Sequence, residues 1–167
     1  MIFVALGANL PGWDGRQPRA TLEHAVRRLA ALPALHVHRL SRWYRTTPVP
    51  ASDQPDYVNA VAALVADPGV TVDPAALLAS LMTIEAECGR QRGEVNAART
   101  LDLDIIAIGS LIRAAPDPIL PHPRAHLRRF VMAPLVDVAP DWVHPILGET
   151  ATALLARLPP DGVSVMS

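Results

Sequence analysis

The sequence predicts an α+β protein with a ferredoxin-like βαββαβ fold, in which an antiparallel sheet carries two helices on one face and is followed by C-terminal additions. Two observations support this prediction. Four segments are rich in strand-forming residues, and two others repeat apolar residues at helical spacing. One long helix falls between the strands of each outer pair. The 167 residues are enough to bury one core, so we expect a single domain over residues 1–167.

The first half of the chain predicts two strands and the first helix. Residues 2–6 form a short apolar run that ends in turn-forming residues, as a strand does. From about residue 18 to Pro33, apolar residues recur every three or four positions, which indicates a helix. Residues 34–46 alternate and are rich in β-formers, so they predict one strand. Three prolines within residues 46–56 prevent regular strand pairing there, so that segment is predicted to be a loop.

The second half predicts the remaining strands and the second helix. Residues 57–66 are apolar on both faces, which indicates a central strand. Asp73 and Pro74 suit the start of a helix that ends at Gly89. Residues 99–109 predict the fourth long strand. Residues 110–145 are rich in proline and are expected to be mostly loop with short helical turns. Residues 150–158 predict a last short helix.

Composition narrows the possible functions. Half of the residues are apolar, 19% are charged and the formal net charge is −1, which favours a soluble globular protein over a general polyanion binder. The single cysteine, Cys88, excludes an intramolecular disulfide framework and fits a reducing compartment, so we expect a cytoplasmic protein. No apolar run is long enough to span a membrane, and residues 1–12 lack the basic start of a signal peptide. All 15 basic residues are arginine, which excludes a P-loop lysine and Schiff-base chemistry.

Two aspartates interrupt the apolar strand predicted at residues 99–109. Asp102 and Asp104 are two positions apart, so their side chains lie on one face of the strand, with Cα atoms about 6.5–7 Å apart. Burying two bare carboxylates side by side is costly. A shared divalent cation would neutralise them, and hard oxygen ligands favour magnesium or manganese over zinc. The alternative is that each aspartate pairs with an arginine at the end of the strand.

Arginines are concentrated on either side of this strand in the sequence. Rigid guanidinium groups, together with metal-binding carboxylates, are suited to gripping a polyphosphate. Glu85, near the end of the second helix, could brace one of the arginines, and the prolines beside His122 fix its backbone. A purely structural network of salt bridges would use the same residues. The seven arginines are Arg90, Arg92, Arg99, Arg113, Arg124, Arg128 and Arg129.

A second group of polar and aromatic residues suits a planar heterocycle. Tyr57 and Asn59 share one face of the predicted central strand. The Asn59 amide offers donors and an acceptor to the edge of a ring, and Phe130 could supply a stacking surface. The alternatives are that neighbouring backbone groups satisfy the Asn59 amide and that Phe130 belongs to the core.

Three other classes of function stay open on the residues alone. The first is a regulatory module that senses a nucleotide without turning it over, and the second is a metal-dependent phosphohydrolase that needs no acceptor. In the third, the arginines form a surface that binds nucleic acid. The aromatic pattern of RNA-binding strands, however, is absent around Trp43 and Tyr44. A zinc pair at His122 and His126 is disfavoured, because Pro123 lies between them and no cysteine or glutamate completes the site.

Four groups of residues together are similar to a known family. They are ALGANL, YRTTPV with DQPDYVNAV, IEAECGRQR with ARTLDLDI, and LPHPRAHLRRFVMAPLVDVAP, and they follow in the family's order from about residue 2 to residue 145. In these segments the chain resembles the 6-hydroxymethyl-7,8-dihydropterin pyrophosphokinases of folate biosynthesis. The resemblance implies an ATP-dependent diphosphotransferase that moves pyrophosphate from ATP to the pterin hydroxymethyl group, by attack at the β-phosphorus, and releases AMP. It implies ATP and the pterin as partners, and no nucleic acid, membrane or obligatory protein partner.

The resemblance also implies roles for individual residues. Asp102 and Asp104 match the ligands of two Mg²⁺ ions that bridge the ATP phosphates. Asn59 would contact the edge of the pterin ring, and Phe130 would stack on it. The residues at catalytic positions are Arg90, Arg92, Arg99, Asp102 and Asp104. Those at ATP contacts are Glu85, Arg90, Arg92, Arg99, His122 and Arg128, and those in the pterin pocket are Thr46, Val49, Tyr57, Asn59 and Phe130.

The chain departs from the family pattern in the segment before Arg99. Asn96 stands where many members have a tryptophan that folds over the pterin. A stacking lid would then be weaker, or would come from Trp13, Trp43 or Trp142. Three long segments rich in glycine, proline or charge are expected to close over the substrates: residues 11–17, 46–56 and 90–99.

Overall fold

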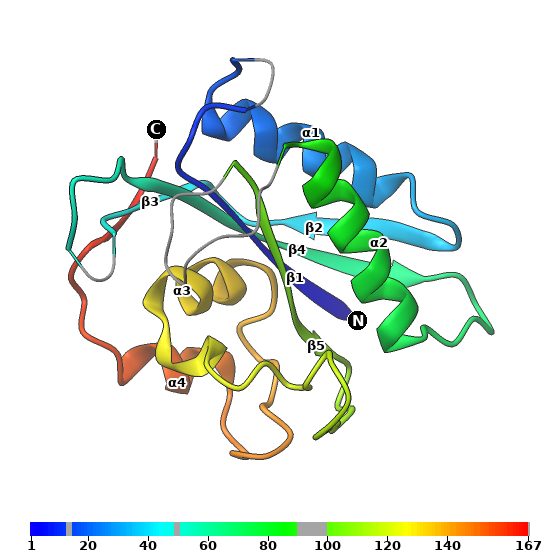
Figure 1. The fold of residues 1–167 in the computed structure, drawn as a ribbon. Coiled ribbons are helices and arrows are strands. Elements are labelled where there is room, and N and C mark those ends of the chain that lie inside the picture. Colours follow the sequence, from blue (N-terminus) through cyan, green and yellow to red (C-terminus); the bar gives the residue numbers. More distant parts are fainter. Residues whose placement is uncertain (13–14, 49–50, 90–99, 167) are drawn as a thin grey trace.

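In the residues that the structure describes, a six-stranded sheet carries helices on both of its faces (Figure 1). The structure is a computed structural model and describes residues 1–12, 15–48, 51–89 and 100–166. The strands are β1 (Ile2–Ala8), β2 (Leu35–Leu40), β3 (Tyr44–Thr46), β4 (Tyr57–Ala66), β5 (Asp102–Ile108) and β6 (Val163–Val165). The helices are α1 (Pro18–Ala30), α2 (Pro74–Glu87), α3 (Arg129–Val138) and α4 (Ala151–Ala156), with a short 3-10 helix, η1, at Ala125–Leu127.

Strand β4 lies inside the sheet, as its apolar pattern predicts. The strand order is β5-β1-β4-β3-β6, and β2 also pairs with β4. One edge of β4 pairs with β1, while β2 and β3 pair with successive parts of β4. All of these pairings are antiparallel. Residues 58–64 of β4 are buried because the strand has partners on both edges and helices over both faces.

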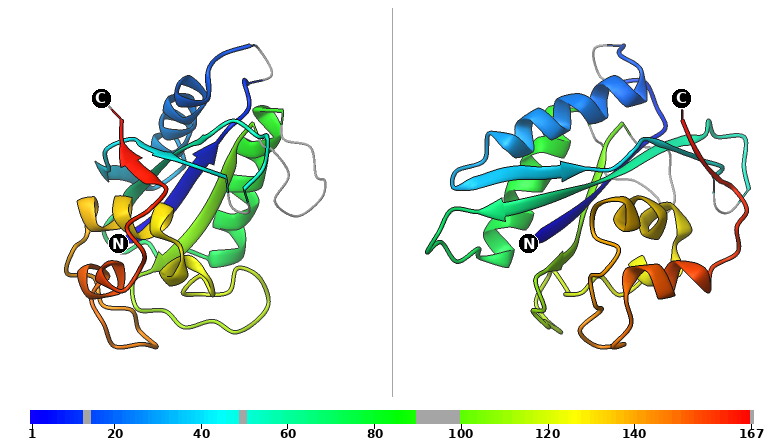
Figure 2. Two further views of the ribbon diagram at one scale, coloured as in Figure 1. Left: turned by 90° about the vertical axis from the view of Figure 1, so that its left-hand side faces the viewer. Right: turned by 180° about the vertical axis from the view of Figure 1, so that it is seen from behind.

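Side chains alternate between the two faces of the sheet, and each face has its own apolar core. Figures 1 and 2 show α1 and α2 over one face of the sheet and α3 and α4 over the other. On the first face, Val4 and Leu6 of β1 pack with α1 and α2. On the second face, Phe3 of β1 packs with α3 and α4. The largest fully buried helix residues are Leu22, Leu29, Leu81 and Ile84 on the first face and Met132 and Leu135 on the second.

The predicted helices α1 and α2 begin and end where the sequence indicates. Pro18 and Pro74 each occupy the first helical position, where the missing N–H removes no intrahelical bond. Gly89 follows α2 with a φ of +81°, a left-handed conformation that glycine adopts without strain. Within the described part of the chain, no helix has both the length and the apolar character needed to cross a membrane.

The prediction of one continuous strand over residues 34–46 is wrong, because the chain leaves regular pairing between β2 and β3. Ser41 N donates to Val61 O at 2.9 Å, and Val61 N donates to Ser41 Oγ at 2.9 Å. The Ser41 hydroxyl therefore takes the place of a backbone carbonyl opposite β4. The pairing of β2 with β4 also shifts register between Val37 and Arg39. A local side-chain bond of this kind leaves no mark on the apolar pattern.

The prediction that residues 110–145 are mostly loop is wrong for α3. This helix has ten residues and contains Pro134, which lacks the N–H for an intrahelical bond. Val131, Met132 and Leu135 are buried against the sheet, and their burial offsets the missing bond. The proline content therefore concealed an amphipathic helix.

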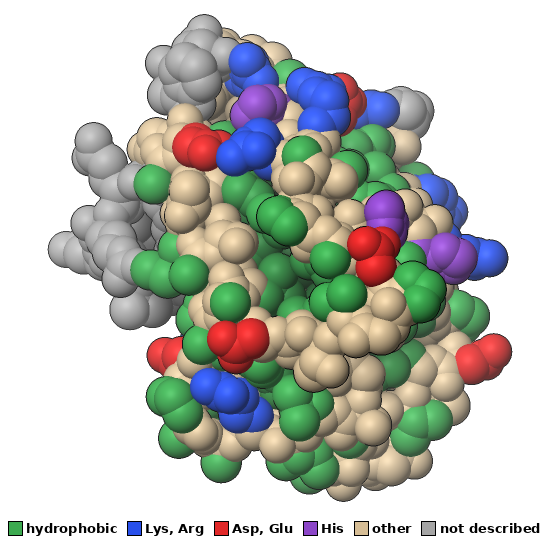
Figure 3. Space-filling view, turned by 90° about the vertical axis from the view of Figure 1, so that its right-hand side faces the viewer, with side chains coloured by type: hydrophobic (Ala, Val, Ile, Leu, Met, Phe, Trp, Pro, Cys, Tyr) green, Lys and Arg blue, Asp and Glu red, His purple; other side chains and the backbone are tan. Residues whose placement is uncertain are grey.

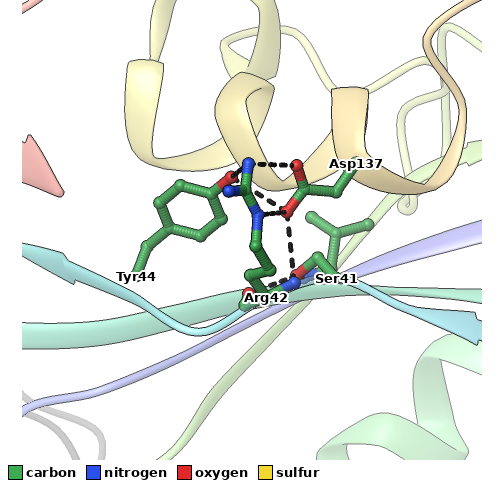
Figure 4. A network of polar contacts seen from close by, with 5 residues as sticks. Ser41, Arg42, Tyr44 and Asp137 are labelled. Carbon is green, nitrogen blue, oxygen red and sulfur yellow. Dashed lines mark hydrogen bonds and ion pairs between the residues drawn. The ribbon is translucent and has the colours of Figure 1, made fainter. Parts of the chain in front are cut away.

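A polar network joins α3 to the connection between β2 and β3 (Figure 4). Arg42 donates to both carboxylate oxygens of Asp137, from Nε at 3.1 Å and from Nη2 at 2.9 Å. The backbone N of Arg42 and the hydroxyl of Tyr44 also donate to Asp137 Oδ2, at 3.1 and 2.9 Å. Burial opposes the charged form of Asp137, but the bonds from Arg42 and Tyr44 outweigh it and lower the pKa of this carboxyl. The network therefore fixes α3 against β3.

We predict that Asp137→Asn lowers the free energy of unfolding by about 1–2 kcal/mol at pH 7, because charge-assisted bonds from Arg42 and Tyr44 are lost. Since the folded-state pKa of Asp137 is depressed, its contribution is present above the ordinary carboxyl pKa of about 4. It disappears as the pH falls through the lower folded-state value. Urea unfolding of wild type and variant from pH 7 to pH 2 measures this, with the exposed Asp141→Asn as control. A stability difference that does not shrink below pH 4 would contradict the account.

Candidate active site

A cavity of about 640 Å³ opens on the α3 face of the sheet, at the end where β1 and β4 leave the apolar core. It brings together eight of the residues that the sequence singles out. They come from β3, β4 and β5, and from the segment that leads from His122 into α3. These residues are Thr46, Tyr57, Asn59, Asp102, Asp104, His122, Arg128 and Phe130.

The cavity exists because β1 has small residues at two positions on this face. Phe3, Ala5 and Gly7 alternate onto the α3 side of the sheet, and Phe3 packs in the apolar core. Ala5 and Gly7 follow it and line the cavity. Gly7 pairs with Asn59 of β4 on one side and Asp102 of β5 on the other. The floor of the cavity is therefore low, with polar side chains on both sides of it.

Asp102 and Asp104 lie on the same face of β5, half-buried and lining the cavity, as the alternation predicts. They are opposite Gly7 and Ala5 in the pairing with β1. Leu103, between them, donates its backbone N–H to Glu85 Oε2 at 2.8 Å. A buried carboxylate on α2 thus holds the backbone that carries the two aspartates. Glu85 is not among the residues that line the cavity.

The carboxylate pair fits a magnesium site that a substrate completes. Among the described residues, no group of three or more histidine, cysteine, aspartate or glutamate side chains could hold a metal ion. Magnesium is commonly bound by one or two carboxylates together with waters and substrate phosphates, whereas structural zinc requires four protein ligands. Asp102 and Asp104 therefore suit a hard cation that arrives with a phosphorylated ligand.

Arg124 and Arg128 form a cationic rim of the cavity, beside His122. The His122 backbone N donates to Ile106 O at 2.8 Å, which fixes the residue beside β5. Burial, and then the charges of Arg128 and Arg124, lower the pKa of His122 to about 4, so its ring is neutral at pH 7. His122 Nδ1 accepts from Arg124 N at 3.1 Å, which leaves the proton of the neutral ring on Nε2. The guanidinium of Arg128 lies 5.7 Å from the centre of the Phe130 ring.

Asn59 and Thr46 form a fixed polar pair at the other end of the cavity. Thr46 Oγ1 donates to Asn59 Oδ1 at 2.6 Å, and both residues are buried, 4% and 7% exposed. This bond fixes the orientation of the amide and turns its Nδ2 towards Gly7. The sequence left open that neighbouring backbone groups satisfy the Asn59 amide. That alternative explains neither the hydrogen bond from Thr46 nor the direction of Nδ2 towards Gly7. Tyr57 and Phe130 complete this end of the cavity.

Several predicted residues lie outside the described residues or away from the cavity. Trp43 packs with the α1–α2 core, under the guanidinium of Arg19 at 5.5 Å, and Trp142 packs edge-on against Phe3 at 6.0 Å. Neither tryptophan lines the cavity, and Trp13 lies outside the described residues, so the source of a stacking lid stays a prediction. The residues outside the described ranges are Trp13, Val49, Arg90, Arg92, Asn96 and Arg99.

The cavity also contains residues that the sequence pattern singles out only as members of larger groups. Arg124 and Arg129 belong to the arginines expected to grip a polyphosphate, and Thr47 and Gln54 to the segment at residues 46–56 expected to close over the substrates. The segment before β6 was not expected near the site, because no local pattern connects it with β3. For the arginines, the signal was their closeness in sequence to Phe130: Arg124 precedes η1 and Arg129 begins α3. For the segment before β6, the sequence contains no comparable signal.

We predict that Gly7→Ala lowers the free energy of unfolding by about 1–3 kcal/mol, because the new Cβ would lie 2.9 Å from Asn59 Nδ2. In an Asn59→Ala background the same change should cost much less, since the opposing amide is gone. Denaturant titration of the four proteins in this double-mutant cycle measures the coupling. An equal cost in both backgrounds would show that the close approach of Gly7 and Asn59 does not matter.

Known proteins share both the sequence pattern and the fold. The family model described as 7,8-dihydro-6-hydroxymethylpterin-pyrophosphokinase (HPPK) matches residues 3–140. The 2-amino-4-hydroxy-6-hydroxymethyldihydropteridine pyrophosphokinase of Pseudomonas aeruginosa is 37% identical over 162 residues, which cover 97% of this chain and 94% of that protein. The Haemophilus influenzae protein of the same name is 38% identical over 143 residues, 86% of this chain and 84% of its own.

Solved structures of Plasmodium falciparum HPPK-DHPS resemble the fold. The wild-type structure superposes with a TM-score of 0.67 at 13% identity and covers 93% of this chain. The wild-type structure with pterin and p-hydroxybenzoate gives a TM-score of 0.68 at 13% identity. This chain spans 44% and 41% of the lengths of those two chains. The family match and the two bacterial relatives, which are similar over nearly their whole length, establish that the chain belongs to the HPPK family.

Proposed function

We propose that this protein transfers pyrophosphate from ATP to the hydroxymethyl group of 6-hydroxymethyl-7,8-dihydropterin, releases AMP and so serves folate biosynthesis. One observation carries the proposal: a single cavity combines a carboxylate pair, a cationic rim and an amide-and-aromatic pocket. A polyphosphate with its metal requires the first two, and a planar heterocycle requires the third. The names of the bacterial relatives agree with this combination.

In this proposal, Asp102 and Asp104 would hold two Mg²⁺ ions, whose charge would stabilise the phosphates during attack at the β-phosphorus. Each carboxylate would offer two oxygens as ligands, and phosphate oxygens or waters would supply the remaining ones. Glu85 would act through the backbone, because its bond to Leu103 N lies between the two aspartates. The resemblance assigns Glu85 to ATP, and that assignment stays a prediction.

The phosphates of ATP would face the cationic rim. Neutral His122 can donate from Nε2 to a phosphate oxygen, and Arg128 and Arg124 supply permanent positive charge. We include Arg124 because it bonds to the ring of His122 through its backbone N. The catalytic roles of Arg90, Arg92 and Arg99 rest on the family resemblance, since these residues lie outside the described ranges.

The pterin would occupy the end of the cavity near Asn59. Its ring carries donors and acceptors along one edge, which match the fixed Asn59 amide. Phe130 and Tyr57 would contact the flat faces of the ring. The hydroxymethyl group would then point towards Asp102, which is two positions from Asn59 across the sheet, through Gly7. Val49, outside the described residues, would complete the pocket as the resemblance implies.

We also propose that the sheet with α1 and α2 on one face is the ferredoxin-like arrangement, that residues 1–167 form one domain and that the protein is cytoplasmic. The strand order β5-β1-β4, with β2 and β3 beyond β4, supports the first point. The single buried cysteine, Cys88, fits a reducing compartment. The protein would need no obligatory protein partner, nucleic acid or membrane for this reaction.

A nucleic-acid surface is the less favoured alternative. Figure 3 gives one face of the molecule, on which basic and acidic side chains are interspersed among apolar ones. A phosphate-binding surface for nucleic acid usually consists of a continuous basic patch, and the net charge here is −1. A nucleotide sensor or a phosphohydrolase would use the same carboxylates and arginines, and neither would need the Thr46–Asn59 pair.

We predict that Asp104→Asn lowers kcat for AMP release by at least about 100-fold, because half of the carboxylate pair loses its charge. The fold should persist, since Asp104 is only half-buried and asparagine has the same shape. Chromatographic detection of AMP, with and without the pterin and Mg²⁺, tests both the function and the residue. The exposed Asp141→Asn is the matched control. Near-normal turnover in Asp104→Asn would remove the pair from the mechanism, and AMP release without the pterin would favour a hydrolase.

A further inference from the structure

The last strand, β6, lies along the edge of the sheet beside the cavity. It pairs antiparallel with β3, with Val163 opposite Thr46. Just before β6, Gly162 O accepts a hydrogen bond from Thr47 N at 3.0 Å. Figures 1 and 2 show this segment running from α4 to the edge of the sheet next to β3. Two of the three β6 residues are exposed, so backbone bonds rather than buried side chains hold the strand.

The segment that leads into β6 forms one wall of the cavity. Its members that line the cavity are Leu158, Pro159, Asp161, Gly162 and Val163. They face the same space as Asn59 and Phe130, but neither the carboxylates nor the cationic rim belongs to this segment. Because Val163 pairs with Thr46, whose hydroxyl bonds to Asn59, the wall stands beside the part of the cavity assigned to the heterocycle.

Gly162 of the wall lies close to Thr47, the residue that follows β3. Gly162 has a φ of +81°, and a Cβ added there would lie 2.9 Å from Thr47 Oγ1. Gly69, in the turn between β4 and α2, has nearly the same φ of +78°, but a Cβ added there would have nothing within 4 Å. Alanine at either glycine would suffer similar backbone strain, and only at Gly162 would its Cβ also press on Thr47, which lines the cavity.

Displacement at Thr47 would reach the polar pair in the cavity. Thr46 is the neighbour of Thr47, pairs with Val163 in β6, and donates to Asn59 Oδ1 at 2.6 Å. Its side chain is buried, so the hydroxyl has little freedom to adjust when the backbone moves. The position of the wall and the orientation of the Asn59 amide are therefore linked through β3.

We propose that residues 158–163 form a specificity wall for the heterocyclic substrate, and that Gly162 is a positioning residue that sets the distance between this wall and the Thr46–Asn59 pair. The inference rests on the proposed function, because it deepens the assignment of the heterocycle to this end of the cavity. It predicts that a change in the wall alters the binding of the heterocycle and leaves the binding of the nucleotide unchanged.

The test compares Gly162→Ala with Gly69→Ala in steady-state assays of AMP release. We expect Gly162→Ala to raise the KM for the pterin about tenfold, while its KM for ATP matches that of Gly69→Ala. Thr47→Ala in the Gly162→Ala background should bring the pterin KM back to within about twofold of Thr47→Ala alone, because the opposing hydroxyl and methyl group are removed. A purely structural role would not give this rescue.

The wild-type assay separates the inference from the proposed function. Wild-type protein that releases no AMP would refute the proposed function. An active wild type whose Gly162→Ala variant has the same pterin KM as Gly69→Ala would refute the wall alone. Equal increases in both KM values, with a lower Tm than that of Gly69→Ala, would also overturn the proposal, because they indicate general loss of structure.

Discussion

The site depends on one steric constraint: a sheet face that is otherwise packed by helices must leave room for polar side chains and a ligand. Strand β1 meets it with Ala5 and Gly7, which follow Phe3 on the α3 face. Gly7 lies between Asn59 and Asp102, and a Cβ there would collide with the Asn59 amide. Without this low floor, the groups proposed to bind the heterocycle and the metal could not face one space. The cavity borders the apolar core of α3 and α4 and shares Ala5, Phe130 and Val131 with it.

The elements around this floor supply charge and rigidity in different ways. Strand β5 brings two carboxylates, and Glu85 of α2 secures the backbone between them through Leu103 N. The segment before α3 brings arginines that help to keep His122 neutral. Helix α3 is in turn fixed to β3 by the bonds of Asp137 with Arg42 and Tyr44. The carboxylates and the cationic rim therefore come from separate elements, each held by contacts outside the cavity, which preorganises the site before any ligand arrives.

Much of this arrangement was predictable from the sequence, and the failures have specific causes. Period-two and helical patterns identified the sheet strands β1, β4 and β5 and the helices α1 and α2, and the D-x-D spacing placed both aspartates on one face. The break at Ser41 was not predictable, because a side-chain hydroxyl replaces a backbone group there. Helix α3 was not predicted because Pro134 lacks the N–H for an intrahelical hydrogen bond. Only the burial of neighbouring side chains against the sheet offsets that loss. The wall before β6 depends on pairing with residues more than one hundred positions earlier, and local patterns carry no such information.

The central claim is that one cavity binds a heterocycle and a metal-bound nucleotide together. Isothermal titration of the wild-type protein with 6-hydroxymethylpterin, with and without Mg²⁺ and a non-hydrolysable ATP analogue, tests this claim most directly. The account predicts that the pterin binds and that its affinity increases when the magnesium–nucleotide complex is present, because the two ligands occupy adjacent parts of one site. Nucleotide binding with no detectable pterin binding under either condition would contradict it, and would favour a nucleotide sensor instead.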